Sequence, residues 1–267
     1  MASYKPDLLL LQEMEKTQYD KYYKSELENI GYKVLFKKRP TIKPDGICIG
    51  YQVDKYTEIE HKYIDLNKIE FVGDSIQEIR KIHKLSDEIN DKELKRGNVS
   101  IITILHCNDN REVGIILCTC HLYFKMDDYL YSIQLIQIDA ILNNIAFYKQ
   151  KYSNYTVILG GDFNSIPNSE VYEYIKYKSS EFKFKLESSY SGYNAKDTTR
   201  SKEPTFTNFT LKFQDTLDYI FYEPMNMRVN SVLELPDKEE ASKETALPNS
   251  HYPSDHLCLL INCSYIK

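Results

Sequence analysis

The sequence predicts an α+β sandwich, in which central β-sheets are covered on the outside by helices. Many short apolar runs alternate with turn residues along the chain, a pattern typical of strands. Between them, a few longer segments repeat apolar residues at helical spacing. No internal repeat or composition break divides the 267 residues, and this length suits one large domain with a full core. We therefore expect a single domain over residues 1–267.

The N-terminal part is predicted to run strand, helix, strand, strand. Residues 7–11 form a short apolar run typical of a buried strand. Residues 15–30 are polar with recurring aromatic and aliphatic positions, which predicts a helix, and Gly31 is suited to end it. Two further strands are predicted over residues 32–36 and 46–51.

The middle of the chain contains one obscure segment and one clear hairpin. Residues 65–96 are charged, with a weak helical pattern around residues 76–85, and are interpreted as an insertion or long connection. Residues 99–105 and 113–120 flank the polar segment 108–112, which predicts a hairpin.

The C-terminal part is predicted to mix helices and strands. Residues 133–147 indicate a helix packed on a sheet. A strand over residues 156–159 precedes a glycine pair, and residues 170–177 predict a short helix. The remaining predicted strands are residues 216–222, 228–235 and 257–261.

Composition excludes several classes of protein. The net charge of −5 argues against a protein that coats DNA through phosphate contacts, although a carboxylate-rich metal site is itself acidic. No apolar stretch approaches the roughly 18 residues that span a bilayer, and no secretory signal is visible. The six cysteines form no C-x-x-C pair, which argues against zinc and favours buried thiols in a reducing compartment.

Four short motifs stand where strands are predicted to end or begin. They supply carboxylate, amide and imidazole groups from distant parts of the chain. Cleavage of a phosphodiester assisted by Mg²⁺ needs hard oxygen ligands for the metal and a group that can donate or accept a proton, and these motifs contain both. The motifs are Leu11-Gln12-Glu13, Gly160-Gly161-Asp162-Phe163-Asn164-Ser165, Leu217-Asp218-Tyr219-Ile220-Phe221 and Ser254-Asp255-His256.

The acidic and amide candidates each have a structural alternative. Glu13 ends an apolar run, where a carboxylate is costly unless paired or bound to metal; alternatively, it begins the next helix. Asp162 and Asn164 are two residues apart, so on an extended segment both side chains face one side and could hold a metal or phosphate oxygen. The alternative for this pair is an Asx-turn that closes a loop.

The imidazole candidates are His256 and His121. A loop that delivers His256 to the start of a strand suits catalysis, and Asp218 could hydrogen-bond this ring and fix its tautomer, although a surface turn is an equal alternative. His121 follows a strand and could reach a phosphate, although a structural histidine is the commoner case. Asn98 and Asp45 are plausible supporting groups.

Three phenylalanines precede Asp218. Phe206, Phe209 and Phe213 could stack on bases beside a phosphodiester site, whereas the alternative is that at least one or two of them fill the core.

Jointly, these motifs resemble the endonuclease/exonuclease/phosphatase superfamily. The similarity spans nearly the whole chain and is greatest to the deadenylase-like branch, which includes carbon-catabolite-repressor-type poly(A) deadenylases, Angel proteins, nocturnin and the 2′,5′-phosphodiesterase. It is carried by the four motifs and by segments 6–7, 45–48, 119–123, 135–137, 206–209, 247–248 and 252–253.

The resemblance implies a DNase-I-like four-layer αββα fold, a cofactor and a role for each site residue. The cofactor is Mg²⁺, with Mn²⁺ as an alternative. Metal ligands would be Glu13, Asp162, Asn164 and Asp255. The catalytic groups would be Glu13, His121, Asp162, Asn164, Asp218 and His256. Substrate would contact Phe213, which matches the adenine-stacking position, together with Asn98, Asn208 and Phe206.

The implied reaction is hydrolysis of 3′-terminal phosphodiesters of single-stranded RNA at poly(A) 3′ ends, with release of 5′-AMP. The same residues would serve a 2′,5′-oligoadenylate phosphodiesterase or a dinucleotide 2′-phosphatase, and a non-catalytic RNA-binding protein is a further alternative. The family's first strand, which carries a metal-binding Asn, has no match before Glu13, so we expect that strand to be missing. The leucine-rich-repeat segment that joins some deadenylases to a larger complex also has no match. We expect a cytoplasmic protein, with nuclear and mitochondrial locations as alternatives.

Overall fold

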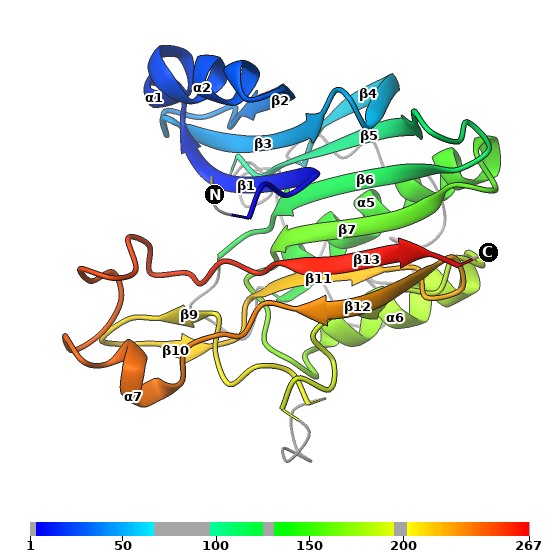
Figure 1. Cartoon of the computed structure of the whole chain (residues 1–267). Coiled ribbons are helices and arrows are strands. Elements are labelled where there is room, and N and C mark those ends of the chain that lie inside the picture. The colour runs from blue at the N-terminus through cyan, green and yellow to red at the C-terminus, as the bar shows by residue number, and fades with distance from the viewer. Residues whose placement is uncertain (1–3, 67–96, 125–130, 195–201, 267) are drawn as a thin grey trace. The chain divides into compact units, whose positions relative to one another are not determined.

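A computed structural model describes residues 4–66, 97–124, 131–194 and 202–266 (Figure 1). Between Gly161 and Asp162 the chain divides into two compact units, Met1–Gly161 and Asp162–Lys267, and each is described by itself. The expectation of a single domain over residues 1–267 stays a prediction. The helical pattern predicted around residues 76–85 lies outside the described residues.

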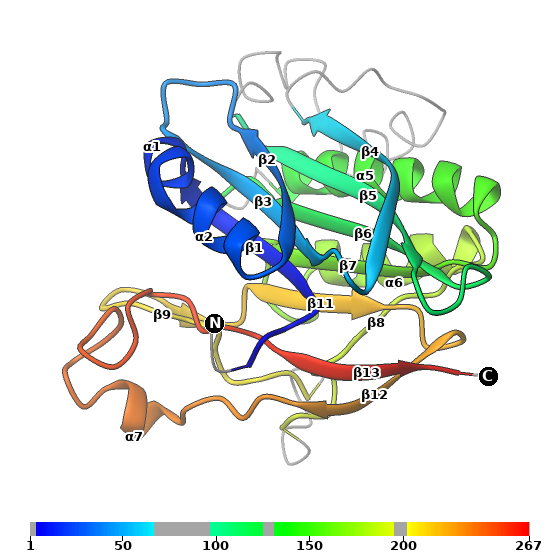
Figure 2. The ribbon, with the colours of Figure 1, turned by 45° about the horizontal axis from the view of Figure 1, so that its top comes forward.

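The first unit begins with a three-stranded antiparallel sheet and a helical segment. The strand order is β1-β3-β2, and Figure 2 shows the helical segment beside these strands. Leu27 of this segment packs with Leu9 and Tyr32 of the sheet, which gives the helix its apolar contact. All four elements predicted over residues 7–51 are confirmed. Their bounds are β1 (Leu8–Glu15), α1 (Lys16–Gln18), the π-helical η1 (Tyr19–Tyr23), α2 (Lys24–Asn29), β2 (Tyr32–Lys38) and β3 (Asp45–Gln52).

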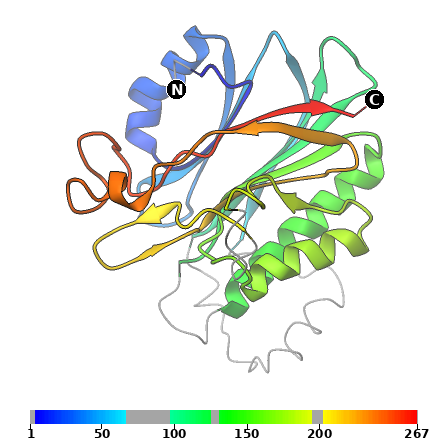
Figure 3. The same ribbon diagram turned by 60° about the horizontal axis from the view of Figure 1, so that its bottom comes forward.

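The second sheet of this unit contains the predicted hairpin. Strands β4 (Tyr56–Asp65), β5 (Val99–Cys107), β6 (Gly114–His121) and β7 (Thr156–Asp162) are hydrogen-bonded neighbours in this order. The hairpin is β5 with β6, which pair in antiparallel register. Helix α5 (Tyr131–Lys151), the long green helix in Figure 3, confirms the helix predicted over residues 133–147.

The first unit is layered because β6 is covered on both sides. Every residue of β6 is buried, since β1 and β3 pack against it and α5 packs against it as well. A strand covered on both faces is expected to be continuously apolar rather than alternating, and residues 115–118 are Ile, Ile, Leu and Cys. The first unit is therefore an α+β sandwich of two sheets with helices outside.

In its described residues, the second unit consists of short strand pairs and two helices. Strand β11 pairs with β8, β9 with β10, and β12 with β13, all antiparallel. Ser169 caps α6 by accepting the Tyr172 amide proton, which explains why the helix begins there. The elements are α6 (Glu170–Glu181), β8 (Glu187–Ser188), β9 (Asn208–Phe209), β10 (Gln214–Asp215), β11 (Asp218–Tyr222), β12 (Met227–Val232), α7 (Lys238–Ala241) and β13 (Ile261–Tyr265).

The strand predicted over residues 257–261 is wrong, because β13 begins only at Ile261. The amide of Leu257 donates to the carbonyl of Thr207, and the amide of Leu260 donates to the hydroxyl of Tyr190. Because of these hydrogen bonds, the apolar segment is held in a loop and does not form the hydrogen-bond ladder of a strand. The side chain of Leu257 fills a small core with Phe206, Phe209 and others.

Two expectations drawn from composition can be compared with the structure. None of the six cysteines, all of which lie in the described residues, forms a disulfide; Cys48, Cys118 and Cys120 are buried and Cys258 is exposed. Burial raises the pKa of the Cys48 and Cys118 thiols to about 12. In the described parts of the chain, no helix has the length and apolarity needed to cross a membrane.

Candidate active site

Asp162 is the last residue of β7 and is buried, with 5 % of its surface exposed. Its Oδ1 accepts the amide proton of Asn164 at 2.8 Å, so the Asx-turn that was the alternative prediction is present. Asn164 takes a positive φ of 48°, which amide and carboxylate side chains tolerate better than most. The turn leaves the second carboxylate oxygen of Asp162 directed toward an imidazole, so the structural and functional interpretations coexist.

Gly161 explains how Asp162 is delivered to this position. Its φ is +147°, and a Cβ added there would overlap the carbonyl oxygen of Cys120 on β6. Only glycine permits this close approach of the two backbones.

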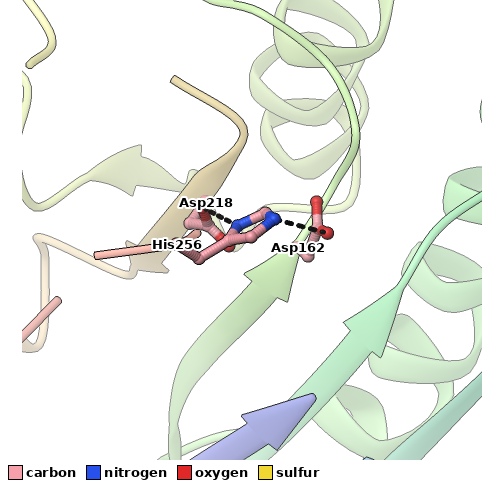
Figure 4. A group of neighbouring side chains, drawn as sticks. All are labelled: Asp162, Asp218 and His256. Carbon is pink, nitrogen blue, oxygen red and sulfur yellow. Dashed lines mark hydrogen bonds and ion pairs between the residues drawn. The ribbon is translucent and has the colours of Figure 1, made fainter. Parts of the chain in front are cut away.

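His256 is held by one aspartate and faces another (Figure 4). Its Nδ1 donates to Oδ2 of Asp218 at 2.8 Å, and its Nε2 lies 4.0 Å from Oδ2 of Asp162. Asp218 is the first residue of β11, and the backbone of His256 forms a bridge to Asn208. These side chains, separated by up to 94 positions in sequence (256 − 162), meet within the second unit.

The electrostatic environment favours the imidazolium form of His256. Burial of the ring lowers its pKa, but the hydrogen bond to Asp218 and the charges of Asp218, Asp162 and Asp255 more than offset this and raise the pKa to about 9. Without a bound cation, the ring is therefore a proton donor at neutral pH.

A titration of the metal-free protein checks this conclusion. We expect the His256 imidazole resonances to titrate near pH 9, and Asp218→Asn to bring the midpoint down. Because the folded-state pKa of His256 is raised above the ordinary value of 6.5, protonation of this ring stabilises the folded protein. This stabilisation is fully present below pH 6.5 and is lost as the pH rises through about 9. A wild-type midpoint at or below 6.5 would contradict the expectation.

Asp255 is fixed from the hairpin formed by β9 and β10. Its Oδ2 accepts the side-chain amide of Asn208 at 3.2 Å, and its carbonyl accepts the amide proton of Phe209 at 3.0 Å. The predicted role of Asn208 in substrate binding stays a prediction; in the structure its amide restrains Asp255.

The donors suit a hard divalent cation. In the described residues, ligand atoms of Asp162, Asp218 and His256 lie within 4.8 Å of one another. The ring of His256 is protonated at neutral pH in the metal-free protein, so the ligands that this group offers there are the carboxylate oxygens of Asp162 and Asp218, which Mg²⁺, Mn²⁺ and Ca²⁺ prefer. The side chains present therefore fit a divalent-metal site.

Glu13 belongs to the first unit and lies at a β-bulge. The register of β1 against β3 shifts between Leu11 and Met14, and Glu13 has a φ of 55°. A bulge re-aims a side chain, and a left-handed non-glycine residue costs of order 1–3 kcal/mol. Glu13 is exposed, and Glu15 rather than Glu13 holds the N-cap position of α1, so the alternative of a helix-initiating residue is wrong. Its predicted role as metal ligand stays a prediction.

His121 ends β6 and is buried against Arg39. The Nη2 of Arg39 lies 2.8 Å from Nδ1 of His121, and its Nε binds Asp45 at 2.6 Å. Because a guanidinium can only donate, the imidazole nitrogen that it faces accepts, and the same Nη2 lies 3.4 Å from Nε2 of this ring. Asn98, also buried, donates to the carbonyl of His121. Asn98 thus supports His121, and its predicted contact with substrate stays a prediction.

Of the three phenylalanines, two fill the core, as the structural interpretation predicted, and one is partly exposed, as stacking on a base requires. Phe206 and Phe209 are buried in one core cluster, whereas Phe213 is 40 % exposed beside the turn between β9 and β10. Phe213 therefore presents a ring that a base could stack on. The predicted substrate contacts of Phe206 and Phe213 have no test in the structure.

Two hydrogen-bond donors to the selected side chains, one in each unit, were not predicted from the sequence. Thr207 donates to Asp218, and Arg39 donates to His121. Neither residue is distinctive in sequence, because a threonine in a strand and an arginine after a strand are common. Thr207 lies within the segment 206–209 that carries the resemblance, whereas Arg39 lies six positions before Asp45 and outside the selected motifs.

A sandwich of two sheets flanked by helices, with a buried aspartate facing an Asp–His pair, is the arrangement of metal-dependent phosphoesterases with the DNase-I-like fold. Solved structures share this fold. Human nocturnin aligns with a TM-score of 0.73 at 24 % identity, covering 99 % of this chain and 83 % of that one. The 2′,3′-cyclic phosphatase ANGEL2, bound to adenosine-2′,3′-vanadate, aligns with a TM-score of 0.76 at 23 % identity, covering 97 % of this chain and 82 % of that one.

The sequence model of the endonuclease/exonuclease/phosphatase family matches residues 1–256, and the chain belongs to this family. Among curated relatives, carbon catabolite repressor protein 4 homolog 4 of Arabidopsis thaliana is 32 % identical over 94 % of this chain. The probable CCR4-Not complex 3′-5′-exoribonuclease subunit Ccr4 of Enterocytozoon bieneusi is 33 % identical over 96 %. The chain spans 65 % and 55 % of these relatives' lengths, respectively. The resemblance to the deadenylase-like branch is confirmed.

Proposed function

We propose that this chain is a Mg²⁺-dependent 3′-exoribonuclease that shortens poly(A) and releases 5′-AMP. The observation that carries the proposal is the imidazolium of His256, held by Asp218 with its Nε2 4.0 Å from Asp162. It occurs in a chain about one-third identical to a relative named as a 3′-5′-exoribonuclease. Single-stranded RNA with an adenosine 3′ end is the proposed partner, and a cytoplasmic location stays a prediction.

Asp162 and Asn164 would hold the cation from the second unit, with Glu13 and Asp255 as further proposed ligands. When bound, Mg²⁺ would lower the pKa of a water molecule and screen the charge of the phosphate. The residues themselves would orient that water and exclude other nucleophiles.

His256 would donate a hydrogen bond to the phosphate as charge develops on it. The attacking water would form a bond to phosphorus and lose a proton, while the bond from phosphorus to the 3′ oxygen of the penultimate nucleotide breaks and that oxygen takes up a proton. The products are 5′-AMP and RNA shortened by one nucleotide with a free 3′ hydroxyl. Because Asp218 fixes the ring through Nδ1, Nε2 is the nitrogen that faces the reacting group.

His121 would contact a phosphate oxygen, with its ring oriented by the hydrogen bond from Arg39. Phe213 would stack on the terminal adenine.

An RNA shortening assay tests the proposal. A 5′-labelled RNA with an oligoadenosine 3′ end is incubated with the protein and Mg²⁺, with Mn²⁺, or with EDTA. We expect a ladder shortening from the 3′ end only with a divalent cation, and 5′-AMP as the product. A matched RNA ending in uridines should shorten more slowly. RNA binding without turnover under all metal conditions would support the non-catalytic alternative and overturn the proposal.

The substrate alternatives are resolved by parallel reactions. The nocturnin and ANGEL2 structures are less than 25 % identical to this chain, so their similarity supports the fold and does not identify the substrate. The same assay therefore includes 2′,5′-oligoadenylate, a dinucleotide 2′-phosphate and a 2′,3′-cyclic phosphate end. Faster release from any of these than from the 3′,5′-linked tail would replace the proposed substrate while keeping the site.

A further inference from the structure

Thr207 is a fully buried residue with all of its hydroxyl hydrogen bonds made. The hydroxyl donates to Oδ2 of Asp218 at 2.6 Å and accepts the amide protons of Leu217 at 2.9 Å and of Asp218 at 3.0 Å. A hydroxyl has one donor and two acceptor positions, so this group is saturated by the segment that carries Asp218. Its geometry is fixed by the backbone and the carboxylate together.

The oxygen that receives the Thr207 hydroxyl is the one that holds the imidazole. Oδ2 of Asp218 accepts Nδ1 of His256 at 2.8 Å as well as the hydroxyl of Thr207 at 2.6 Å. Two donors that converge on one oxygen fix both the rotation of the carboxylate and the lone pair that faces the ring.

The backbone of Thr207 connects the same two segments. Its amide donates to the carbonyl of Asp215 at 3.0 Å, and its carbonyl accepts the amide proton of Leu257, the residue after His256, at 2.7 Å. One residue thus links the start of β11 to the loop that presents His256, through both its side chain and its main chain.

We propose that Thr207 is a positioning residue that sets the orientation of the Asp218–His256 pair. Asp218 can orient the ring only if its own carboxylate is oriented, and Thr207 supplies that constraint. The proposal rests on the proposed function for its kinetic consequences, but the hydrogen-bond arrangement is independent of substrate. Displacement of a catalytic group by about 1 Å can cost on the order of 100-fold in rate.

The competing interpretation is that Thr207 serves only the stability of the turn. The Val side chain has nearly the shape of Thr but no hydroxyl, so Thr207→Val removes the donor while keeping the volume. Thr216→Val is the matched control: Thr216 is equally buried, and its hydroxyl donates at 2.6 Å to the carbonyl of Pro204 and not to Asp218. Each substitution is expected to lower the melting temperature, because buried polar partners lose a hydrogen bond.

The test measures kcat, KM and the exchange rate of the His256 Nδ1 proton, at a temperature where each variant is folded. For Thr207→Val we expect kcat to fall by roughly 10- to 100-fold with KM within about threefold of wild type. We expect faster exchange of the Nδ1 proton with solvent, and recovery of both readouts in Thr207→Ser. Thr216→Val should keep kcat and the exchange rate near those of the wild type.

Two results would overturn the proposal. One is a Thr207→Val protein with the stability loss of Thr216→Val but wild-type kcat and proton exchange. The other is a Thr207→Ser protein as impaired as Thr207→Val. If Thr207→Val does not fold, Thr207→Cys keeps a weak donor in place and should show intermediate kcat and exchange; wild-type values would overturn the proposal. If wild-type protein turns over no substrate, the proposed function fails, and the proton exchange rates alone decide the role of Thr207.

Discussion

His256→Ala is expected to lower kcat by roughly 1,000-fold, with a much smaller change in KM. The ring is the cationic donor of the site, because Asp218 holds its Nδ1 and three carboxylates raise its pKa to about 9. Its removal leaves developing phosphate charge without that donor in the transition state. Initial rates on the oligoadenosine RNA, measured at saturating divalent cation, give kcat and KM separately.

The matched control is His251→Ala in the same loop. His251 is exposed and lies five positions before His256, outside the Asp162–Asp218–His256 group. We expect this variant to keep wild-type kcat, which would separate loss of the catalytic ring from loss of a histidine in the loop. Equal kcat for His256→Ala and wild type would remove His256 from the reaction, and a melting temperature unchanged in both variants would exclude unfolding as the cause.

The sequence motifs could predict Asp162, Asp218 and His256 because each stands next to a recognisable apolar run. In the structure they meet within one unit, and Asp162 additionally forms the turn that was its alternative interpretation. Thr207 and Arg39 could not be predicted, because their contribution is a hydrogen bond to another side chain and leaves no periodic pattern. The bulge at Glu13 could not be predicted from the sequence either, since a register shift depends on how β1 pairs with its partner strand β3.

Strands that are completely buried could be predicted from the sequence, whereas partly exposed strands were harder to predict. Strand β6 is buried throughout and reads as one apolar run, whereas β4 alternates between half-buried and exposed residues and was not predicted. Its sequence, Tyr-Thr-Glu-Ile-Glu-His-Lys, shows no apolar face, because the half-buried Glu58 and Glu60 accept hydrogen bonds from Tyr51 and Tyr152 while Ile59 is exposed. Leu257 shows the opposite error: an apolar residue near a strand can enter the core from a loop.

Phe221→Ala is expected to cost roughly 3–5 kcal/mol of unfolding free energy, which is a large part of the stability of a typical domain. Phe221 is fully buried in β11, and its ring packs within 5.3–5.6 Å, centroid to centroid, of the rings of Phe163, Tyr172 and Tyr219. Truncation leaves a cavity among rigid rings that cannot collapse to fill it. Urea denaturation followed by circular dichroism measures the loss.

Phe213→Ala is the control that separates burial from recognition. The same side chain is removed, but Phe213 is 40 % exposed, so we expect a loss below about 1 kcal/mol together with a raised KM for adenosine-ended RNA. Phe221→Ala should show the reverse, with lowered stability and near-normal KM in the folded fraction. Similar unfolding free energies for the two variants would contradict the packing argument. An unchanged KM for Phe213→Ala would place base recognition elsewhere, because stacking on an exposed ring contributes in the complex and not in the free protein.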